Sequence, residues 1–137
     1  MTVTVYIDGL ALPSNPGTGT YGYVIYDGPK KLGEGMGLAG REVTSNFAEY
    51  TALAEALKRL KALKIEGDIL VKSDSKLLVG HMAESWKVKG GMYVSKLKEV
   101  RELMKEFGSI RFEWIPREMN EEADLLTRVA YENQRGR

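Results

Sequence analysis

Four acidic side chains stand where one expected secondary-structure element ends and another begins: Asp8, Glu49, Asp74 and Asp124. Carboxylates that meet at one edge of a sheet repel one another, and divalent cations commonly neutralise such a cluster. Four oxygen ligands can hold two cations about 4 Å apart, an arrangement suited to in-line displacement at a phosphodiester. The sequence therefore predicts metal-assisted chemistry.

The first two acids also have local explanations. The pair Asp8-Gly9 could form a turn after the first strand. Glu49 could reach back to the amide of Asn46, as in a capping box. Against this, Glu49 shares a helical stripe with Leu53 that is expected to face the sheet, where an unpaired carboxylate is costly.

The other two acids have local alternatives as well. Asp74 could be the N-cap of the helix that follows it. Asp124 could pair with Arg128, one helical turn further on, for roughly a few tenths of a kcal/mol. However, working groups gather at the carboxyl ends of strands in an α/β sheet, and the first turns of helices can point at the same edge. Taken together, the four acids favour a shared site.

Composition narrows the choice of metal and compartment. The chain has no cysteine and a single histidine, His81, which excludes disulfides, thiolate sites and multi-histidine zinc sites. A metal would be held by oxygen, which indicates Mg²⁺ or Mn²⁺. The net charge is only +1, and no apolar run reaches membrane-spanning length. We expect one domain over residues 1–137 and a cytoplasmic protein without membrane association.

Hydrophobic periodicity predicts the element order βββαβααβα. The expected strands cover residues 2–8, 21–26, 31–38, 69–71 and 110–115. The expected helices cover residues 47–63, 75–85, 94–107 and a last segment capped by Asn120. A turn-rich stretch is expected over residues 8–20. The fold class is α/β, with a mixed five-stranded sheet and helices on both of its faces.

Five segments in this order resemble the motifs of type I ribonuclease H. They are Tyr6-Ile7-Asp8-Gly9, Asn15-Pro16-Gly17 with Tyr21-Gly22-Tyr23, Thr44-Ser45-Asn46-Phe47-Ala48-Glu49-Tyr50, Lys72-Ser73-Asp74-Ser75, and Asn120-Glu121-Glu122-Ala123-Asp124. Order, spacing and element succession agree over nearly the whole chain. The resemblance implies the ribonuclease H-like fold and an endoribonuclease that cleaves the RNA strand of RNA–DNA hybrids, leaving 3′-hydroxyl and 5′-phosphate ends.

The resemblance also implies a role for each acid. Asp8 matches the aspartate that bridges two metal ions, here Mg²⁺ or Mn²⁺. Asp124 matches the ligand of the ion that activates the attacking water. Glu49 and Asp74 match the ligands of the second ion, with Glu49 beside the ribose 2′-hydroxyl. All four are thus expected to be catalytic residues and metal ligands.

Further residues match positions that contact the hybrid. Recognition in the wide minor groove uses shape, phosphate and the 2′-hydroxyl instead of base edges. Thr44 matches a position that grips a DNA-strand phosphate, and Gly9 permits close approach of the backbone. The expected contacts are Gly9, Asn15, Thr44, Ser45, Asn46 and Ser75.

The chain departs from the family's best-known bacterial pattern in two places. A loop histidine of many members is missing from residues 115–119, where Arg117 or Glu118 could help instead, or the loop could be a solvated turn. The basic protrusion between the two middle helices is also missing. Lys87 and Lys89 could supply a smaller basic surface for phosphate.

Other functions on this fold stay open from the sequence. One alternative is a nuclease that acts on double-stranded RNA or on DNA junctions. Another is a non-catalytic domain that binds hybrids, although a binder of phosphate would gain from losing the four negative charges. We expect an RNA–DNA hybrid as partner, double-stranded RNA as a further candidate, and a monomer.

Overall fold

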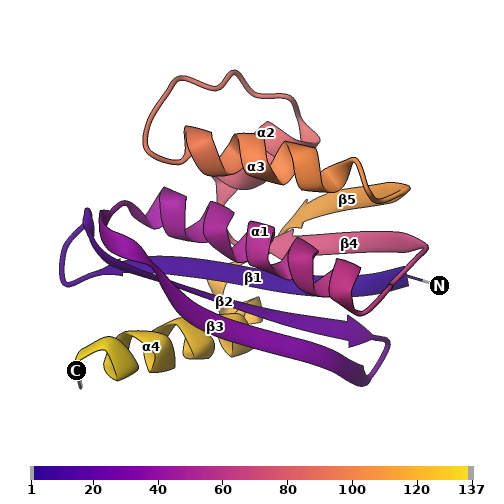
Figure 1. The fold of residues 1–137 in the computed structure, drawn as a ribbon, viewed down its shortest axis with the longest axis horizontal. Coiled ribbons are helices and arrows are strands. Elements are labelled where there is room, and N and C mark those ends of the chain that lie inside the picture. The colour runs from indigo at the N-terminus through magenta and orange to yellow at the C-terminus, as the bar shows by residue number, and fades with distance from the viewer. Residues whose placement is uncertain (1, 136–137) are drawn as a thin grey trace.

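The computed structural model describes residues 2–135 and confirms the predicted order of elements (Figure 1). The strands are β1 (Thr2–Leu12), β2 (Gly17–Asp27), β3 (Lys30–Val43), β4 (Asp68–Ser73) and β5 (Ser109–Trp114). The helices are α1 (Ser45–Ala62), α2 (Lys76–Ala83), α3 (Val94–Met104), a 3₁₀ turn η1 (Arg117–Met119) and α4 (Glu121–Arg135). Within the described residues, no helix is both long and apolar enough to cross a membrane.

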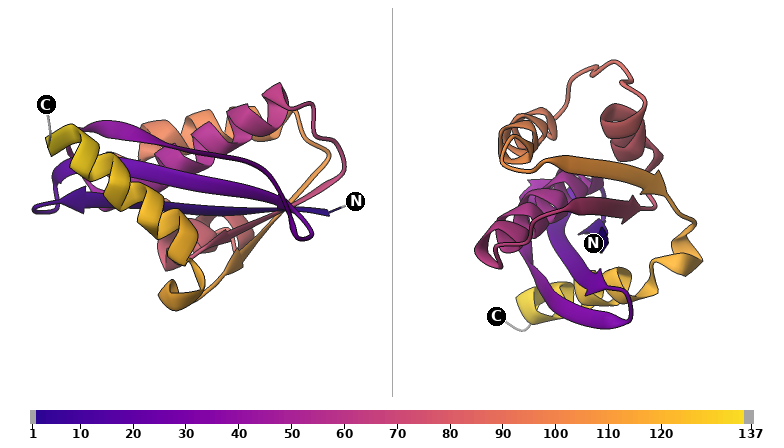
Figure 2. Two further views of the ribbon diagram at one scale, coloured as in Figure 1. Left: turned by 90° about the horizontal axis from the view of Figure 1, so that it is seen from below. Right: turned by 90° about the vertical axis from the view of Figure 1, so that its right-hand side faces the viewer.

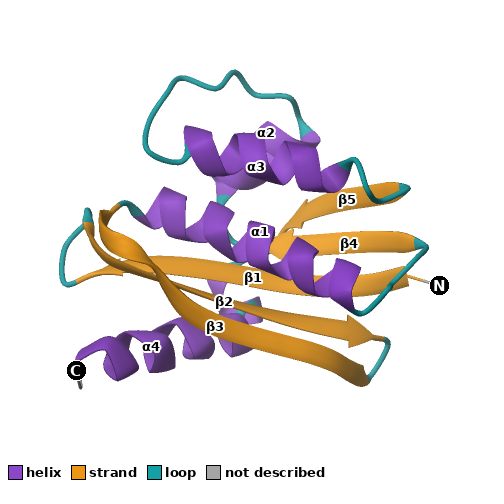
Figure 3. Cartoon of the chain, viewed as in Figure 1, coloured by secondary structure: helices purple, strands orange, loops and turns teal. Residues whose placement is uncertain are grey.

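The strands form one mixed five-stranded sheet in the order β3-β2-β1-β4-β5 (Figure 3). The first three strands are joined by short links and pair antiparallel. Strand β4 follows α1 and pairs parallel with β1, and β5 follows α2 and α3 and pairs parallel with β4. This agrees with the general rule that tight turns join antiparallel strands, whereas parallel strands need a longer crossover.

The helices lie on both faces of the sheet, as predicted (Figure 2). Helix α1 packs on β1 and β2, and α3 packs beside α1, whereas α4 crosses β1, β2 and β3 on the opposite face. The side chains of Val3, Val5 and Ile7 alternate toward the α1 side and are fully buried. They meet Leu53 and Leu57 of α1, and each such side chain contributes about 1.5–3 kcal/mol when fully buried. This core fixes β1 and α1 relative to each other.

The path of β1 corrects the sequence prediction. The strand does not stop at Asp8, and the expected turn-rich stretch over residues 8–20 is mostly strand, because β1 runs to Leu12 and β2 begins at Gly17. Strand β2 continues to pair with β1 as far as Leu12, whereas β4 leaves it after the pair Ile7–Ser73. Asp8 therefore lies just beyond the end of β4, in the middle of its own strand.

Other boundaries differ by a few residues. Strand β3 extends to Val43 because it follows the full length of β2. Helix α1 begins at Ser45 instead of residue 47, and α3 ends at Met104 instead of residue 107. The earlier start of α1 places the predicted site residues Ser45 and Asn46 in its first turn.

Candidate active site

Three of the four predicted acids converge. Asp8 comes from the middle of β1, Glu49 from the start of α1, and Asp74 directly follows β4. Each offers a carboxylate oxygen, and these three oxygens lie within 4.8 Å of one another. Residues 8, 49 and 74 are far apart in sequence, so it is the parallel pairing of β1 with β4 and the packing of α1 on β1 that bring them together.

Gly9 allows the start of α1 to approach β1 closely. A Cβ atom at this position would lie 2.4 Å from the carbonyl carbon of Ala48 and 2.4 Å from the amide nitrogen of Glu49. Both atoms belong to the backbone and cannot swing aside. The absence of a side chain at Gly9 therefore brings Glu49 within reach of Asp8.

Replacing Gly9 with alanine is expected to push α1 away from β1. We expect a loss of stability of about 1–3 kcal/mol, the usual cost of overpacking, together with weaker metal binding. Urea unfolding and metal titration would measure the two effects. Gly108→Ala is the matched control, because a Cβ atom there would meet nothing within 4 Å. Equal stability of the two variants would contradict this role of Gly9.

Burial and mutual repulsion shape the electrostatics of the cluster. Burial, followed by the charges of Asp74, Glu49 and Asp124, raises the pKa of Asp8 to about 9. Burial also raises the pKa of Glu49 to about 7 and the pKa of Asp74 above its ordinary value. Buried acids without a counter-charge resist ionisation. The cluster consequently favours either protons or a bound cation.

The donor set fits a hard divalent cation. All three donors are carboxylate oxygens, which Mg²⁺ and Mn²⁺ prefer. Over residues 2–135, Asp8, Glu49 and Asp74 form the one group of three acidic, histidine or cysteine side chains with ligand atoms this close. The cluster is therefore a candidate site for a divalent metal.

The fourth acid stands slightly apart. The Oδ2 atom of Asp124 accepts a hydrogen bond from Nε of Arg128 at 3.2 Å, so the local pairing foreseen from the sequence is present. The charge of Asp124 nevertheless contributes to raising the pKa of both Asp8 and Asp74. Asp124 thus lies near the cluster, with its side chain held by the neighbouring arginine.

Two local explanations for the acids are wrong. Helix α1 is capped by Thr44, whose Oγ1 accepts from the Phe47 amide at 3.2 Å, so Glu49 is too far along the helix to close a capping box. Helix α2 is capped by Ser75, whose Oγ accepts from the Leu78 amide at 3.1 Å, and not by Asp74. Both acids are thereby left available to the cluster.

The predicted hybrid contacts surround the start of α1. Nδ2 of Asn15 donates to Oγ of Ser45, and the Ser45 amide donates to Oδ1 of Asn15, both at 3.0 Å. This reciprocal pair ties the β1–β2 hairpin to α1. Asn46 follows in the first turn of α1, and Thr44 precedes it as the cap. Gly9 is buried under the same helix end.

The two predicted basic residues lie on the segment between α2 and α3. Lys87 and Lys89 are exposed and line a cavity of about 440 Å³ together with His81, Trp86 and Tyr93. His81 is buried, and its Nδ1 shares a hydrogen bond of 2.7 Å with the Tyr50 hydroxyl. His81 is therefore a packing residue, and the two lysines border a cavity that aromatic side chains also line.

Arg117 and Glu118, the two residues that could take the place of the missing loop histidine, have different surroundings. Residues 117–119 form the turn η1. The charge of Arg117 opposes the rise in pKa of both Glu49 and Asp74, which places this guanidinium near the cluster. Glu118 instead lines a separate pocket beside α4.

One residue near the cluster was missed by the sequence analysis. Asn120 was expected to cap α4, but its buried Oδ1 has no hydrogen-bond partner among the described residues. Its Nδ2 donates instead to the backbone oxygen of Ile7 at 2.8 Å and to Oδ2 of Asp74 at 3.5 Å. Asn120 thus ties β1 to the residue after β4. An asparagine before an acidic helix start is typical of a cap, so the sequence carried no signal for this contact.

The fold and the acidic cluster together define a ribonuclease H-like protein with a candidate metal site. A family model described as reverse transcriptase-like matches residues 7–130. RNase H1 of Halobacterium salinarum NRC-1 superposes with a TM-score of 0.88 at 32% identity, covering 97% of this chain and 99% of that one. LC11-RNase H1, solved in complex with an RNA/DNA hybrid, gives 0.89 at 32% identity, covering 96% and 98%. The chain belongs to the type 1 ribonuclease H family.

One relative by sequence is a much longer protein than this chain. The chain is 35% identical over 133 residues to the bifunctional protein Rv2228c of Mycobacterium tuberculosis, covering 95% of this chain and 35% of the relative. The chain thus spans about a third of the length of the mycobacterial relatives that it matches.

Proposed function

We propose that this protein is a ribonuclease H that hydrolyses the RNA strand of RNA–DNA hybrids with the help of divalent metal ions. The observation that carries the proposal is the convergence of Asp8, Glu49 and Asp74 within 4.8 Å at the carboxyl end of β4. Support comes from the family and from the hybrid bound to the related LC11 enzyme. The products would carry 3′-hydroxyl and 5′-phosphate ends.

The acids have distinct roles in this proposal. When bound, two Mg²⁺ or Mn²⁺ ions would supply an activated water and positive charge at the leaving oxygen. Asp8 is the most buried of the three acids and would be the shared ligand, with Glu49 and Asp74 holding one ion. Asp124 would be a ligand of the second ion once its side chain no longer pairs with Arg128. Asn120 would orient Asp74 through Nδ2.

The surrounding polar groups would position the hybrid. Asn15 and Ser45 already fix each other's orientation, and with Asn46 they would present side chains to the wide minor groove. The start of α1, capped by Thr44, carries the positive end of the helix dipole, which favours a phosphate nearby. Ser75 would contact the ribose side of the RNA strand beside Asp74.

The proposal also covers the domain organisation, the compartment and the oligomeric state. We place the whole activity in one domain formed by residues 1–137 and expect a cytoplasmic monomer. The single sheet, with α1 and α4 packed on it and α3 packed beside α1, supports one folding unit. Analytical ultracentrifugation would check the monomeric state.

A substrate panel tests the proposal directly. Labelled RNA–DNA hybrid, RNA duplex and DNA duplex of one sequence are incubated with Mg²⁺, with Mn²⁺ and with EDTA. We expect cleavage of the RNA strand of the hybrid with either metal, and none with EDTA. Cleavage limited to the RNA or DNA duplex would instead identify a nuclease of another specificity on this fold. Binding of the hybrid without cleavage under any metal condition would indicate a non-catalytic domain.

Replacing both Lys87 and Lys89 with alanine is expected to raise KM for the hybrid about threefold to tenfold with little change in kcat. Each lysine that neutralises a phosphate also adds roughly 0.7–0.9 to the salt slope of binding. The slope should therefore fall by about one to two in the double variant. Steady-state cleavage at several salt concentrations measures both effects.

Lys30 and Lys64 provide the control for this experiment. They are exposed like Lys87 and Lys89 but follow β2 and α1 at the end of the sheet away from Asp8. Their double alanine variant should keep both KM and the salt slope. Equal effects of the two double variants would show that general charge, and not this segment, sets the affinity.

A further inference from the structure

The tryptophan at the end of β5 is bonded to one acid of the cluster. Trp114 is the last residue of the strand, and its Nε1–H donates to the backbone oxygen of Asp74 at 3.1 Å. The two residues are 40 positions apart in sequence. They meet because β4 and β5 pair in parallel with Ser73 beside Trp114. An indole has one donor and no acceptor, so this bond uses the whole hydrogen-bonding capacity of the side chain.

The peptide unit between Asp74 and Ser75 is held at both ends. Strand pairing ends one residue earlier, where the amide of Ile115 donates to the backbone oxygen of Ser73 at 2.9 Å. The next carbonyl, that of Asp74, accepts from the indole. The amide of Ser75, in the same peptide unit, donates to Oγ of Ser73 at 3.0 Å. Because a peptide unit is planar, these two bonds fix its orientation and with it the direction in which the Asp74 side chain leaves the backbone.

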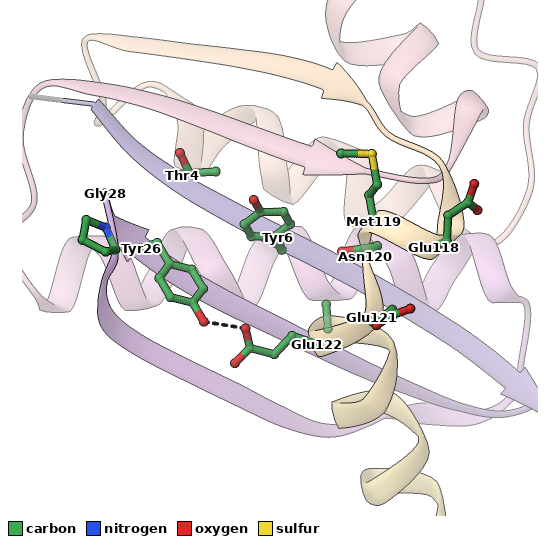
Figure 4. Close-up of a pocket in the computed structure, with 11 residues that line it drawn as sticks. Thr4, Tyr6, Tyr26, Gly28, Glu118, Met119, Asn120, Glu121 and Glu122 are labelled. Carbon is green, nitrogen blue, oxygen red and sulfur yellow. Dashed lines mark hydrogen bonds between the residues drawn. The ribbon is translucent and has the colours of Figure 1, made fainter.

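Asp74 needs such bonds more than the other acids of the cluster. Asp8 lies within β1 and Glu49 within α1, whose own backbone hydrogen bonds hold them, whereas Asp74 lies between β4 and α2. Figure 4 shows Asn120 beside β1, at the turn that leads into α4. Its Nδ2 lies 3.5 Å from Oδ2 of Asp74. Asp74 is therefore held by α4's first turn through its side chain and by β5 through its backbone.

Packing does not account for a tryptophan at this position. Trp114 is 42% exposed, and a cavity of about 230 Å³, which Val79 and Trp86 also line, stays open beside it. The ammonium of Lys76 lies 5.2 Å from the ring centroid, in a cation–π contact. A phenylalanine could make that contact and cover the same surface. The N–H group is what distinguishes tryptophan here, and it binds Asp74.

We propose that Trp114 is a positioning residue of the metal site, which holds Asp74 where its carboxylate can meet those of Asp8 and Glu49 around a divalent ion. The inference rests on the proposed function of Asp74 as a metal ligand, and it concerns the affinity for metal before any cleavage. Partners that orient a metal ligand typically account for about 10–100-fold in affinity or activity. Since this bond reaches the backbone and not the carboxylate, we expect an effect near the lower limit, about tenfold.

A Mn²⁺ titration of the full chain without nucleic acid tests the proposal, with electron paramagnetic resonance measuring the free ion. Trp114→Phe keeps a ring beside Lys76 but removes the N–H, and we expect the Kd for Mn²⁺ to rise about tenfold. Trp86→Phe is the matched control, because Trp86 lines the same cavity, is 47% exposed and packs against the backbone of Gly80. It should keep the parental Kd. Unchanged affinity in Trp114→Phe, or equal losses in both variants, would overturn the proposal.

An isosteric replacement separates the hydrogen bond from the packing of the ring. β-(3-Benzothienyl)alanine at position 114 keeps the two fused rings and carries sulfur in place of the N–H. It should reproduce the loss of Mn²⁺ affinity, and parental affinity would overturn the proposal even if Trp114→Phe failed to fold.

Hybrid cleavage provides a further readout. At limiting Mg²⁺, Trp114→Phe should lower kcat with little change in KM, and about tenfold more Mg²⁺ should restore kcat. A loss that high metal does not restore would indicate general damage to the site and would count against the proposal. If the parent protein cleaves no hybrid, the proposed function fails, but the Mn²⁺ titration still decides the role of Trp114.

Discussion

Replacing Asp8 with asparagine is expected to lower the rate of metal-dependent hybrid cleavage by about 10³-fold or more, a loss typical of removing a principal electrostatic group. Asp8 is 7% exposed, and its carboxylate lies within 4.8 Å of those of Glu49 and Asp74. The amide keeps the shape of the side chain but removes the charge that would bridge two metal ions. Single-turnover cleavage in Mg²⁺ and in Mn²⁺ measures the loss.

Binding and stability should respond differently from activity. Without metal, Asp8→Asn should bind the hybrid about as well as the parent protein, since a negative charge facing the substrate is gone. It should also unfold at a higher Tm, by roughly 3–8 °C for a gain of about 1–2 kcal/mol. Asp68→Asn, at the exposed start of β4, is the control and should change neither property. Cleavage by Asp8→Asn at the parental rate would remove Asp8 from the proposed mechanism.

The element order was predictable because the strands and helices carry clear periodicity. Val3, Val5 and Ile7 alternate toward one face, and the stripe through Leu53 and Leu57 follows the helical repeat. The end of β1 was not predictable from the same pattern. Whether a strand stops after an Asp-Gly pair depends on a partner strand, and here β2 continues the pairing to Leu12. Local turn propensity was overridden by tertiary pairing.

The residues of the acidic cluster could be predicted from the sequence, but the directions and contacts of the side chains around it could not. Asp8, Glu49 and Asp74 were identified from motifs, and the structure brings them within 4.8 Å. The side-chain direction of Asp124 depends on Arg128, which competes for it across one helical turn. The contact from Asn120 to Asp74 joins residues 46 positions apart. Such long-range side-chain bonds leave no periodic signal in a sequence.

The acidic cluster should also make the stability of the metal-free protein fall as pH rises. The folded-state pKa is about 9 for Asp8 and about 7 for Glu49, against ordinary values of 3.8 and 4.5. Between these limits the folded protein holds protons that the unfolded chain has already released. The free energy of unfolding therefore decreases with pH in this window, because the native state binds more protons than the unfolded state.

We expect urea unfolding in EDTA to show a loss of at least about 2–3 kcal/mol between pH 5 and pH 9, because the shift of Glu49 alone carries that much and the shift of Asp8 adds to it. Asp8→Asn should flatten the profile above pH 7, because the side chain with the higher pKa no longer titrates. Saturating Mg²⁺ should restore stability at pH 9 in the parent and much less in the variant, since the ion replaces the protons as the counter-charge. A metal-free profile that rises from pH 5 to pH 9 would mean that the carboxylates are already neutralised by other groups. The same measurement thus tests whether the acids that would perform catalysis are held together at the expense of stability.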